Sequence, residues 1–129
     1  MLLDCRLKRH PPFLETVFKA GKAEEFAGAA WDSGHLGLMA FPSETWIVDF
    51  DKREITAGDG SGAPYRIATL TETDIRGVDR FRGEFVLNRL SGDLYIYRQA
   101  DGNITIMDLK IPTSFSWTFR CSRISSPLA

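Results

Sequence analysis

The chain contains two histidines, His10 and His35, and only His35 has groups beside it that suit catalysis, in the segment Asp32-Ser33-Gly34-His35. A hydrolase would need His35 as base, a serine as nucleophile and a carboxylate such as Asp32 to orient the imidazole. No nucleophile elbow accompanies these residues, and Asp, Ser and Gly in succession are typical of a turn. We therefore expect a turn at this segment and no enzymatic activity.

Two other segments have the composition of a ligand site. Asp49 and Asp51 have the spacing of a metal-binding acidic pair, but on an alternating strand both carboxylates would face solvent without a third ligand. The segment Gly58-Asp59-Gly60-Ser61-Gly62 would suit phosphate only ahead of a helix, and residues 63–67 have an extended pattern. The cysteine and histidine spacings do not fit zinc. The sequence therefore predicts no metal and no cofactor.

The charge balance excludes partners that need a strong field. Sixteen basic and seventeen acidic residues leave a formal charge of −1, so the arginines that lie among aromatics in residues 66–98 do not predict nucleic-acid binding. No apolar run approaches the ~20 residues of a membrane span. The first residues lack the apolar core of a signal peptide. We expect a cytoplasmic protein, or a periplasmic one if an export leader is missing from the chain as given.

Short alternating segments determine the expected architecture. They cover residues 1–9, 45–50, 65–68, 73–76, 81–107 and 115–121, with turn residues between them. Strands at intervals of ~8–12 residues are typical of an antiparallel sandwich or small barrel. Residues 13–31 approach helical spacing and predict a short helical or irregular cover. The predicted fold is a single all-β domain, residues 1–129, in which an antiparallel meander forms a small barrel or sandwich.

Two turn signals predict the register within the meander. Asp101-Gly102 suits a two-residue hairpin that pairs Ile96 with Met107, and a four-residue loop at 90–93 would pair Leu87 with Ile96. Gly92 suits a left-handed position in that loop. One face of the sheet would then carry Phe85, Leu87, Leu94, Ile96, Met107 and Leu109, and the other Val86, Asn88, Tyr95, Tyr97, Ile104, Ile106, Gln99 and Asp108.

The second face is the candidate binding surface, because it combines two tyrosines with polar groups. Tyrosine offers a flat apolar ring with a polar tip, which suits amphipathic ligands and protein surfaces. The candidate binding residues are Tyr95, Tyr97, Asn88, Gln99 and Asp108. The competing interpretation, which we favour from sequence, is that Phe13, Phe18 and Phe26 of the cover segment pack on this face. A barrel interior lined by Trp46, Phe50, Phe85 and Trp117 is a second place for a ligand.

Both cysteines are expected to point inward on the first and last strands. Cys5 shares a face with Leu3 and Leu7, and Cys121 shares one with Phe119. If these strands are neighbours, a disulfide could join the two ends of the domain. The alternative is a pair of buried, reduced cysteines that pack as small hydrophobes. Two cysteines do not decide between these alternatives.

Four segments carry a resemblance to a known group of proteins. They are the strand Leu3–Lys8, the segment Thr45–Asp51, the hairpin Asn88-Arg89-Leu90-Ser91-Gly92-Asp93-Leu94, and the closing Phe119-Arg120-Cys121. In these features the chain resembles small uncharacterised all-β proteins of Gram-negative bacteria, which are often exported. The resemblance implies a compact β domain and is compatible with a Cys5–Cys121 bridge, and it brings no activity. The chain departs from that pattern in its longer 10–44 segment.

These observations lead to two function hypotheses from different classes. The first is a non-catalytic binding module for a small amphipathic ligand or a protein partner. The alternative is a structural protein that forms a homodimer through an apolar sheet face or an edge strand.

Overall fold

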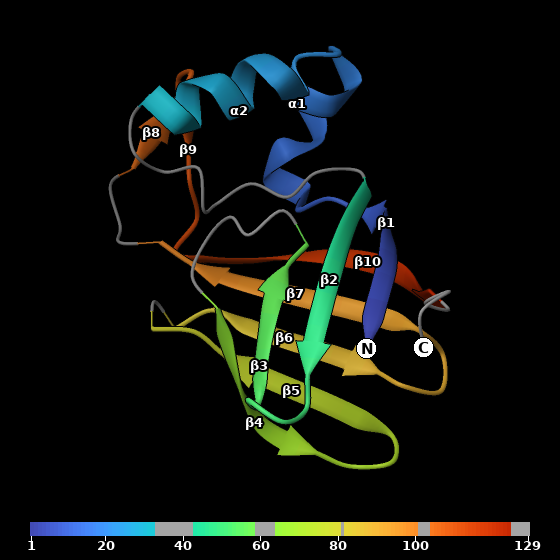
Figure 1. The fold of residues 1–129 in the computed structure, drawn as a ribbon. Helices are drawn as coiled ribbons and strands as arrows, with labels where there is room; N and C mark the ends of the chain where they lie inside the picture. The colour runs from blue at the N-terminus through green and yellow to red at the C-terminus, as the bar shows by residue number, and fades with distance from the viewer. Residues whose placement is uncertain (33–42, 59–63, 81, 101–103, 125–129) are drawn as a thin grey trace.

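The chain forms a closed, eight-stranded antiparallel β-barrel with helices over one end (Figure 1). This computed structural model describes residues 1–32, 43–58, 64–80, 82–100 and 104–124. The predicted all-β class and meander are thereby confirmed. The barrel strands are β1 (Leu2–Arg9), β2 (Ser43–Asp49), β3 (Glu54–Ala57), β4 (Tyr65–Leu70), β5 (Asp74–Val78), β6 (Glu84–Asn88), β7 (Asp93–Gln99) and β10 (Ser114–Ile124).

The strand order follows the chain except where the barrel closes. Strands β2 to β7 are consecutive neighbours, β10 pairs with β7, and β1 fits between β10 and β2. Each barrel strand therefore has a neighbour on both sides, which leaves no edge strand in the barrel. Self-association through a barrel edge strand, one form of the alternative hypothesis, has no free edge to use.

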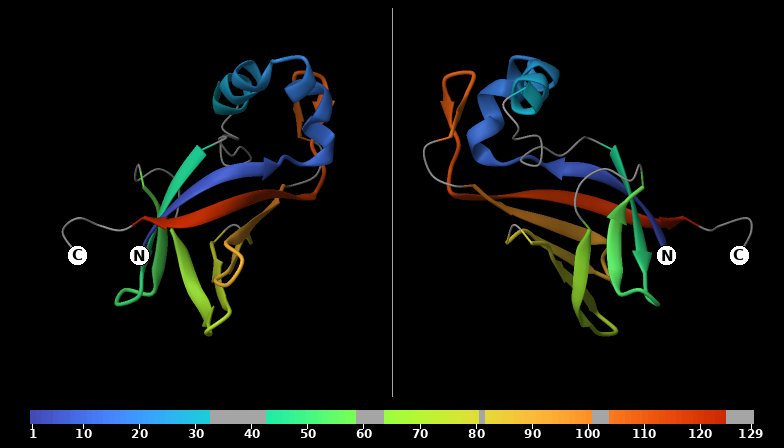
Figure 2. Two further views of the ribbon diagram at one scale, coloured as in Figure 1. Left: turned by 90° about the vertical axis from the view of Figure 1, so that its right-hand side faces the viewer. Right: turned by 60° about the vertical axis from the view of Figure 1, so that its left-hand side comes forward.

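The helical segment covers an end of the barrel. It consists of a 3₁₀ turn η1 (Pro12–Leu14), α1 (Glu15–Lys19) and α2 (Ala23–Asp32), so the predicted cover is helical. Pro12 stands in the first turn, where its missing N–H costs no hydrogen bond. Phe13 meets Phe115 edge-on and Phe18 meets Trp117 edge-on, and both partners lie on β10. Figure 2 shows these helices projecting beyond the strands rather than lying along their outer face.

The segment after β7 differs from the prediction. Residues 104–110 do not pair with β7; instead β8 (Thr105–Ile106) and β9 (Leu109–Lys110) form a hairpin of their own, close to α2 (Figure 1). Ile96 therefore faces Trp117 of β10, and Met107 lies in the β8–β9 turn with φ 51°. The local Asp101-Gly102 signal falls outside the described residues. The long-range β7–β10 pairing, which closes the barrel, determines the partner of β7 instead.

The predicted register of β6 and β7 is shifted by two residues. Leu87 faces Leu94 and Phe85 faces Ile96, so the loop comprises residues 89–92 rather than 90–93. The Asn88 side chain explains the shift, because its Oδ1 accepts hydrogen bonds from the backbone N–H groups of Leu90 and Ser91 at 2.9 and 3.0 Å. A shift of two preserves the faces, and the four residues named here are buried in the barrel as predicted.

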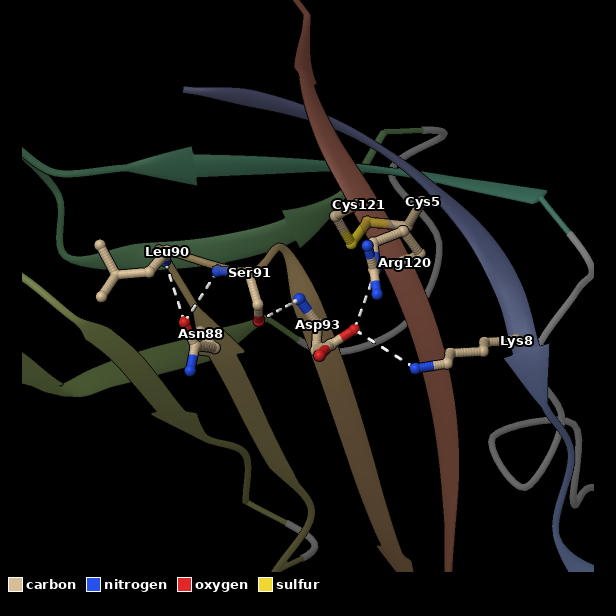
Figure 3. Close-up of polar contacts among 8 residues, drawn as sticks. All are labelled: Cys5, Lys8, Asn88, Leu90, Ser91, Asp93, Arg120 and Cys121. Carbon is tan, nitrogen blue, oxygen red and sulfur yellow. Dashed lines mark hydrogen bonds and ion pairs between the residues drawn. A yellow bond between two sulfur atoms is a disulfide. The ribbon is translucent and has the colours of Figure 1, made fainter.

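The barrel is closed covalently as well as by hydrogen bonds. Cys5 of β1 and Cys121 of β10 are register partners and form a disulfide, which joins positions 116 residues apart (Figure 3). Gly92 packs beside this bridge with φ 79°, the left-handed conformation expected from the sequence. Its carbonyl accepts a hydrogen bond of 2.7 Å from the Cys121 N–H, and a Cβ at position 92 would stand 2.4 Å from the Cys121 carbonyl oxygen. This contact leaves room only for glycine.

Candidate functional site

The two tyrosines of the candidate site lie on the outer face of the barrel. Strand β7 alternates, with Leu94 and Ile96 buried inside and Tyr95 and Tyr97 exposed by 37% and 42%. Their ring centroids are 6.4 Å apart and their planes differ by 20°. The helices lie over the end of the barrel, so the expected cover by Phe13, Phe18 and Phe26 does not reach these tyrosines, and that expectation was wrong.

The neighbours of the tyrosines follow from the strand register. Tyr95 lies between Val86 of β6 and Thr118 of β10, and Tyr97 lies between Glu84 and Ser116 of the same two strands. We call this six-residue set the tyrosine face: Glu84, Val86, Tyr95, Tyr97, Ser116 and Thr118. Its members are uncharged except Glu84, which is the register partner of Tyr97, and Arg76 lies next to Val86 on β5.

The remaining candidate residues are dispersed. Gln99 is exposed at the end of β7 on the same side as the tyrosines. Asn88 closes the loop before β7 through its Oδ1, as described above. Asp108 lies in the β8–β9 turn with φ 62°, on a hairpin outside the barrel sheet. The structure thus brings Tyr95, Tyr97 and Gln99 together on one strand and places Asp108 elsewhere.

The barrel interior contains three of its four predicted aromatic residues. Trp46, Phe85 and Trp117 are buried, whereas Phe50 is 39% exposed in the turn after β2. Phe50 falls outside because it follows the end of β2, and the Arg89 guanidinium carbon lies 6.0 Å from its ring centroid. The prediction that Phe50 lines the barrel interior was therefore wrong.

The Arg98 side chain lies inside the barrel, which the sequence had not led us to expect. Arg98 continues the inward alternation of Leu94 and Ile96, so its side chain meets Tyr65 on β4. It donates a hydrogen bond to the Tyr65 hydroxyl, and its guanidinium carbon lies 5.5 Å from the Tyr65 ring centroid. The alternation Leu94-x-Ile96-x-Arg98 is the sequence signal that could have revealed an inward-facing charge.

Trp46 is next to this group and has an unusual hydrogen-bonding state. Its ring meets Tyr65 and Phe85 edge-on, with centroids 5.9 and 5.4 Å away. Its Nε1 is buried and has no hydrogen-bond partner in the described part of the chain. An unpaired buried donor costs about 1–3 kcal/mol, so its retention in a well-packed barrel calls for an explanation. We call Trp46, Tyr65, Phe85 and Arg98 the Trp46 cluster.

Asp93 lies between two basic side chains from different strands, and its role is structural (Figure 3). Its Oδ1 lies 3.0 Å from Arg120 Nε on β10 and 3.7 Å from Lys8 Nζ on β1. Desolvation raises the pKa of Asp93, but the hydrogen bond with Ser91 and the charges of Arg120 and Lys8 outweigh it and hold the pKa below its ordinary value. These contacts link β7 to its neighbour β10 and to β1, the next strand beyond it, beside the disulfide.

The side chains with catalytic potential either form local hydrogen bonds or belong to residues that the structure does not describe. His10 Nε2 lies 2.5 Å from Glu15 Oε2, and this hydrogen bond is the main reason why the pKa of Glu15 is lowered. Asp49 Oδ1 accepts the Lys52 N–H at 3.0 Å, which is turn chemistry. Ser33 and His35, like Gly60 to Gly62, fall outside the described residues. Within the described ranges, no three His, Cys, Asp or Glu side chains are grouped to hold a metal.

Comparison of the chain with protein-family models, with curated proteins and with solved structures found no match. Among the described residues, no helix is both long and apolar enough to span a membrane.

Proposed function

We propose that this chain is a non-catalytic binding module that recognises a partner protein through the tyrosine face. The observation that carries the proposal is the exposure of Tyr95 and Tyr97 side by side on the outer face of the barrel, in a six-residue face whose one charged member is Glu84. Tyrosine is enriched at protein interfaces because a rigid ring buries a large apolar area while its hydroxyl keeps a hydrogen bond.

The arrangement around the tyrosines supports this choice of partner. Protein interfaces combine an aromatic centre with a polar, charged border. The register places Val86, Ser116 and Thr118 beside the tyrosines, and the charged residues Glu84 and Arg76 lie next to Tyr97 and Val86 respectively. Small-molecule sites are usually concave, whereas the outside of a closed barrel is convex. A macromolecular surface therefore fits this face better than a small amphipathic ligand does.

Site-specific photocrosslinking in the native host tests the proposal. Tyr97 is replaced by p-benzoylphenylalanine, and the control carries the same residue at Arg66, which is also exposed on a barrel strand. We expect a discrete heteromeric adduct from position 97 that is absent from position 66. Adding Tyr95→Ser to the position-97 chain should abolish this adduct, because it removes half of the aromatic centre without touching the core.

The adduct masses separate the two function hypotheses. An adduct of twice the chain mass would show self-association and would overturn the partner-protein proposal in favour of the homodimer. Equal adducts from both positions, or none from position 97, would also overturn it.

A further inference from the structure

The row of the sheet that contains Tyr95 has an arginine at each end. Its register partners cross five strands in the order Arg76 of β5, Val86 of β6, Tyr95 of β7, Thr118 of β10 and Arg9 of β1. Directly opposite residues share a face of the sheet, so all five side chains are on the outside of the barrel, and both arginines are exposed. Neighbouring strands are ~4.8 Å apart, so the two arginine positions are about 19 Å apart along the sheet, with no charge in the row between them.

A bulge in β1 places Arg9 in this row. The register of β1 with β10 shifts just before Arg9, so Thr118 faces Arg9 instead of Lys8. A bulge re-aims the side chains around it, and here both Lys8 and Arg9 are exposed. Lys8 lies 3.7 Å from the Asp93 carboxylate, whereas Arg9 and Arg76 form no ion pair within the part of the chain that the structure describes. The charges at the two ends of the row are therefore available to a partner.

We propose that the partner of the tyrosine face is an acidic protein segment, which packs an apolar side chain on Tyr95 and pairs its carboxylates with Arg9 and Arg76. This inference rests on the proposed function and adds the chemistry of the partner. Arginine binds a carboxylate through two parallel N–H donors, so a pair at each end of the row would set the orientation of the segment as well as attract it. An extended segment advances ~3.3 Å per residue, so the two carboxylates should be about six residues apart.

Glu84 favours a protein segment over a nucleic acid. It is exposed and is the register partner of Tyr97, so a phosphate that reached the tyrosines would lie beside a carboxylate. A phosphate backbone carries a charge at every nucleotide and cannot avoid this repulsion. A protein segment can place its acidic residues at the ends of the Tyr95 row and a neutral residue opposite Glu84, which belongs to the neighbouring row.

Charge reversal in the chain that carries the crosslinker at position 97 tests the two arginines. Arg9→Glu/Arg76→Glu replaces both attractions by repulsions, so we expect the yield of the heteromeric adduct in the host to fall about tenfold. The matched control is Lys22→Glu/Lys110→Glu, which changes the net charge equally at exposed residues outside the tyrosine face. The control should retain the adduct, because the proposed pairing is local to the Tyr95 row.

A measurement without charge reversal covers the case in which a double variant fails to fold. Mass spectrometry of the digested adduct identifies the partner segment that is joined to position 97, and we expect Asp and Glu to outnumber Lys and Arg in that segment.

The outcomes distinguish this inference from the proposed function. A protein adduct with a neutral or basic segment, or equal adduct yields with and without Arg9→Glu/Arg76→Glu, would overturn the acidic partner and leave the partner-protein proposal intact. Equal loss of the adduct in both double variants would show dependence on net charge alone and would also overturn it. An adduct that nuclease removes, or no heteromeric adduct at all, would overturn the proposed function together with this inference.

Discussion

Gly92→Ala should be the most destabilising glycine substitution among the described turns and helices, because two separate penalties coincide there. The first is conformational: φ is 79°, and a Cβ in the left-handed region costs about 1 kcal/mol. The second is steric: the Cβ would stand 2.4 Å from the Cys121 carbonyl oxygen, and displacing β10 would weaken the 2.7 Å bond from the Cys121 N–H, which together cost about 2 kcal/mol. We therefore expect a loss of about 3 kcal/mol.

Two other glycines separate these penalties. Gly21 has φ 68° but nothing within 4 Å of its Cβ position, so Gly21→Ala should cost only about 1 kcal/mol. Gly28 lies within α2, also with open space around it, so Gly28→Ala should stabilise the chain by about 0.5–1 kcal/mol through helix propensity.

The assay is urea unfolding of the three variants with the disulfide intact. The free energies of unfolding are compared between variants whose urea m-values agree, because an equal m-value indicates that the denatured state is unchanged. If Gly92→Ala lowered the free energy of unfolding no more than Gly21→Ala does, the close approach of Gly92 to Cys121 would be wrong. Our account of how the 89–92 loop packs against β10 would then be wrong as well.

Three further predictions concern closure and surface. Cys5→Ala/Cys121→Ala should lower the unfolding free energy by about 4–5 kcal/mol in guanidinium, because the bridge spans 116 residues; an unchanged midpoint would contradict the bridge. Asp93→Asn should be less stable at neutral pH and should lose less stability on acidification. The lowered pKa of Asp93 stabilises the folded state at pH values above the ordinary pKa of 3.8, and this contribution is lost as the pH falls through the folded-state pKa. The urea midpoints of both proteins are measured as the pH is lowered, and an equal loss of stability in both would refute that role. Tyr97→Ser should change the unfolding free energy by less than about 1 kcal/mol, because the side chain is on the outer face; a larger loss by the same assay would show that the tyrosine is part of the core.

The parts of the fold that depend on local patterns could be predicted from the sequence. Alternation alone placed Leu94 and Ile96 inside the barrel, because a side-chain period of two assigns each residue to a face whatever the partner strand. The same reasoning put Cys5 and Cys121 on inward faces. Whether they met depended on β1 lying next to β10, which is a property of barrel closure and not of either strand.

The errors arose where a long-range contact overrode a local signal. The β8–β9 hairpin leaves the sheet because β10 takes its place beside β7, and no local turn signal specifies that choice. The register shifted because the Asn88 side chain closes the loop by accepting two backbone N–H groups through its Oδ1. Arg98 had a readable inward pattern that was overlooked. The unpaired Trp46 Nε1 could not be predicted, since it depends on what the whole barrel places around it.

Hydroxyl-radical footprinting tests the central claim, that the tyrosine face is occupied by a partner protein in the cell. Oxidation of Tyr95 and Tyr97 is compared between the purified chain and intact host cells, with buried Tyr65 as the protected reference and exposed Leu90 as the reactive one. We predict that both outer tyrosines react in the purified chain and become protected in cells, while Leu90 reacts in both. Equal oxidation of Tyr95 and Tyr97 in the two states would contradict the account.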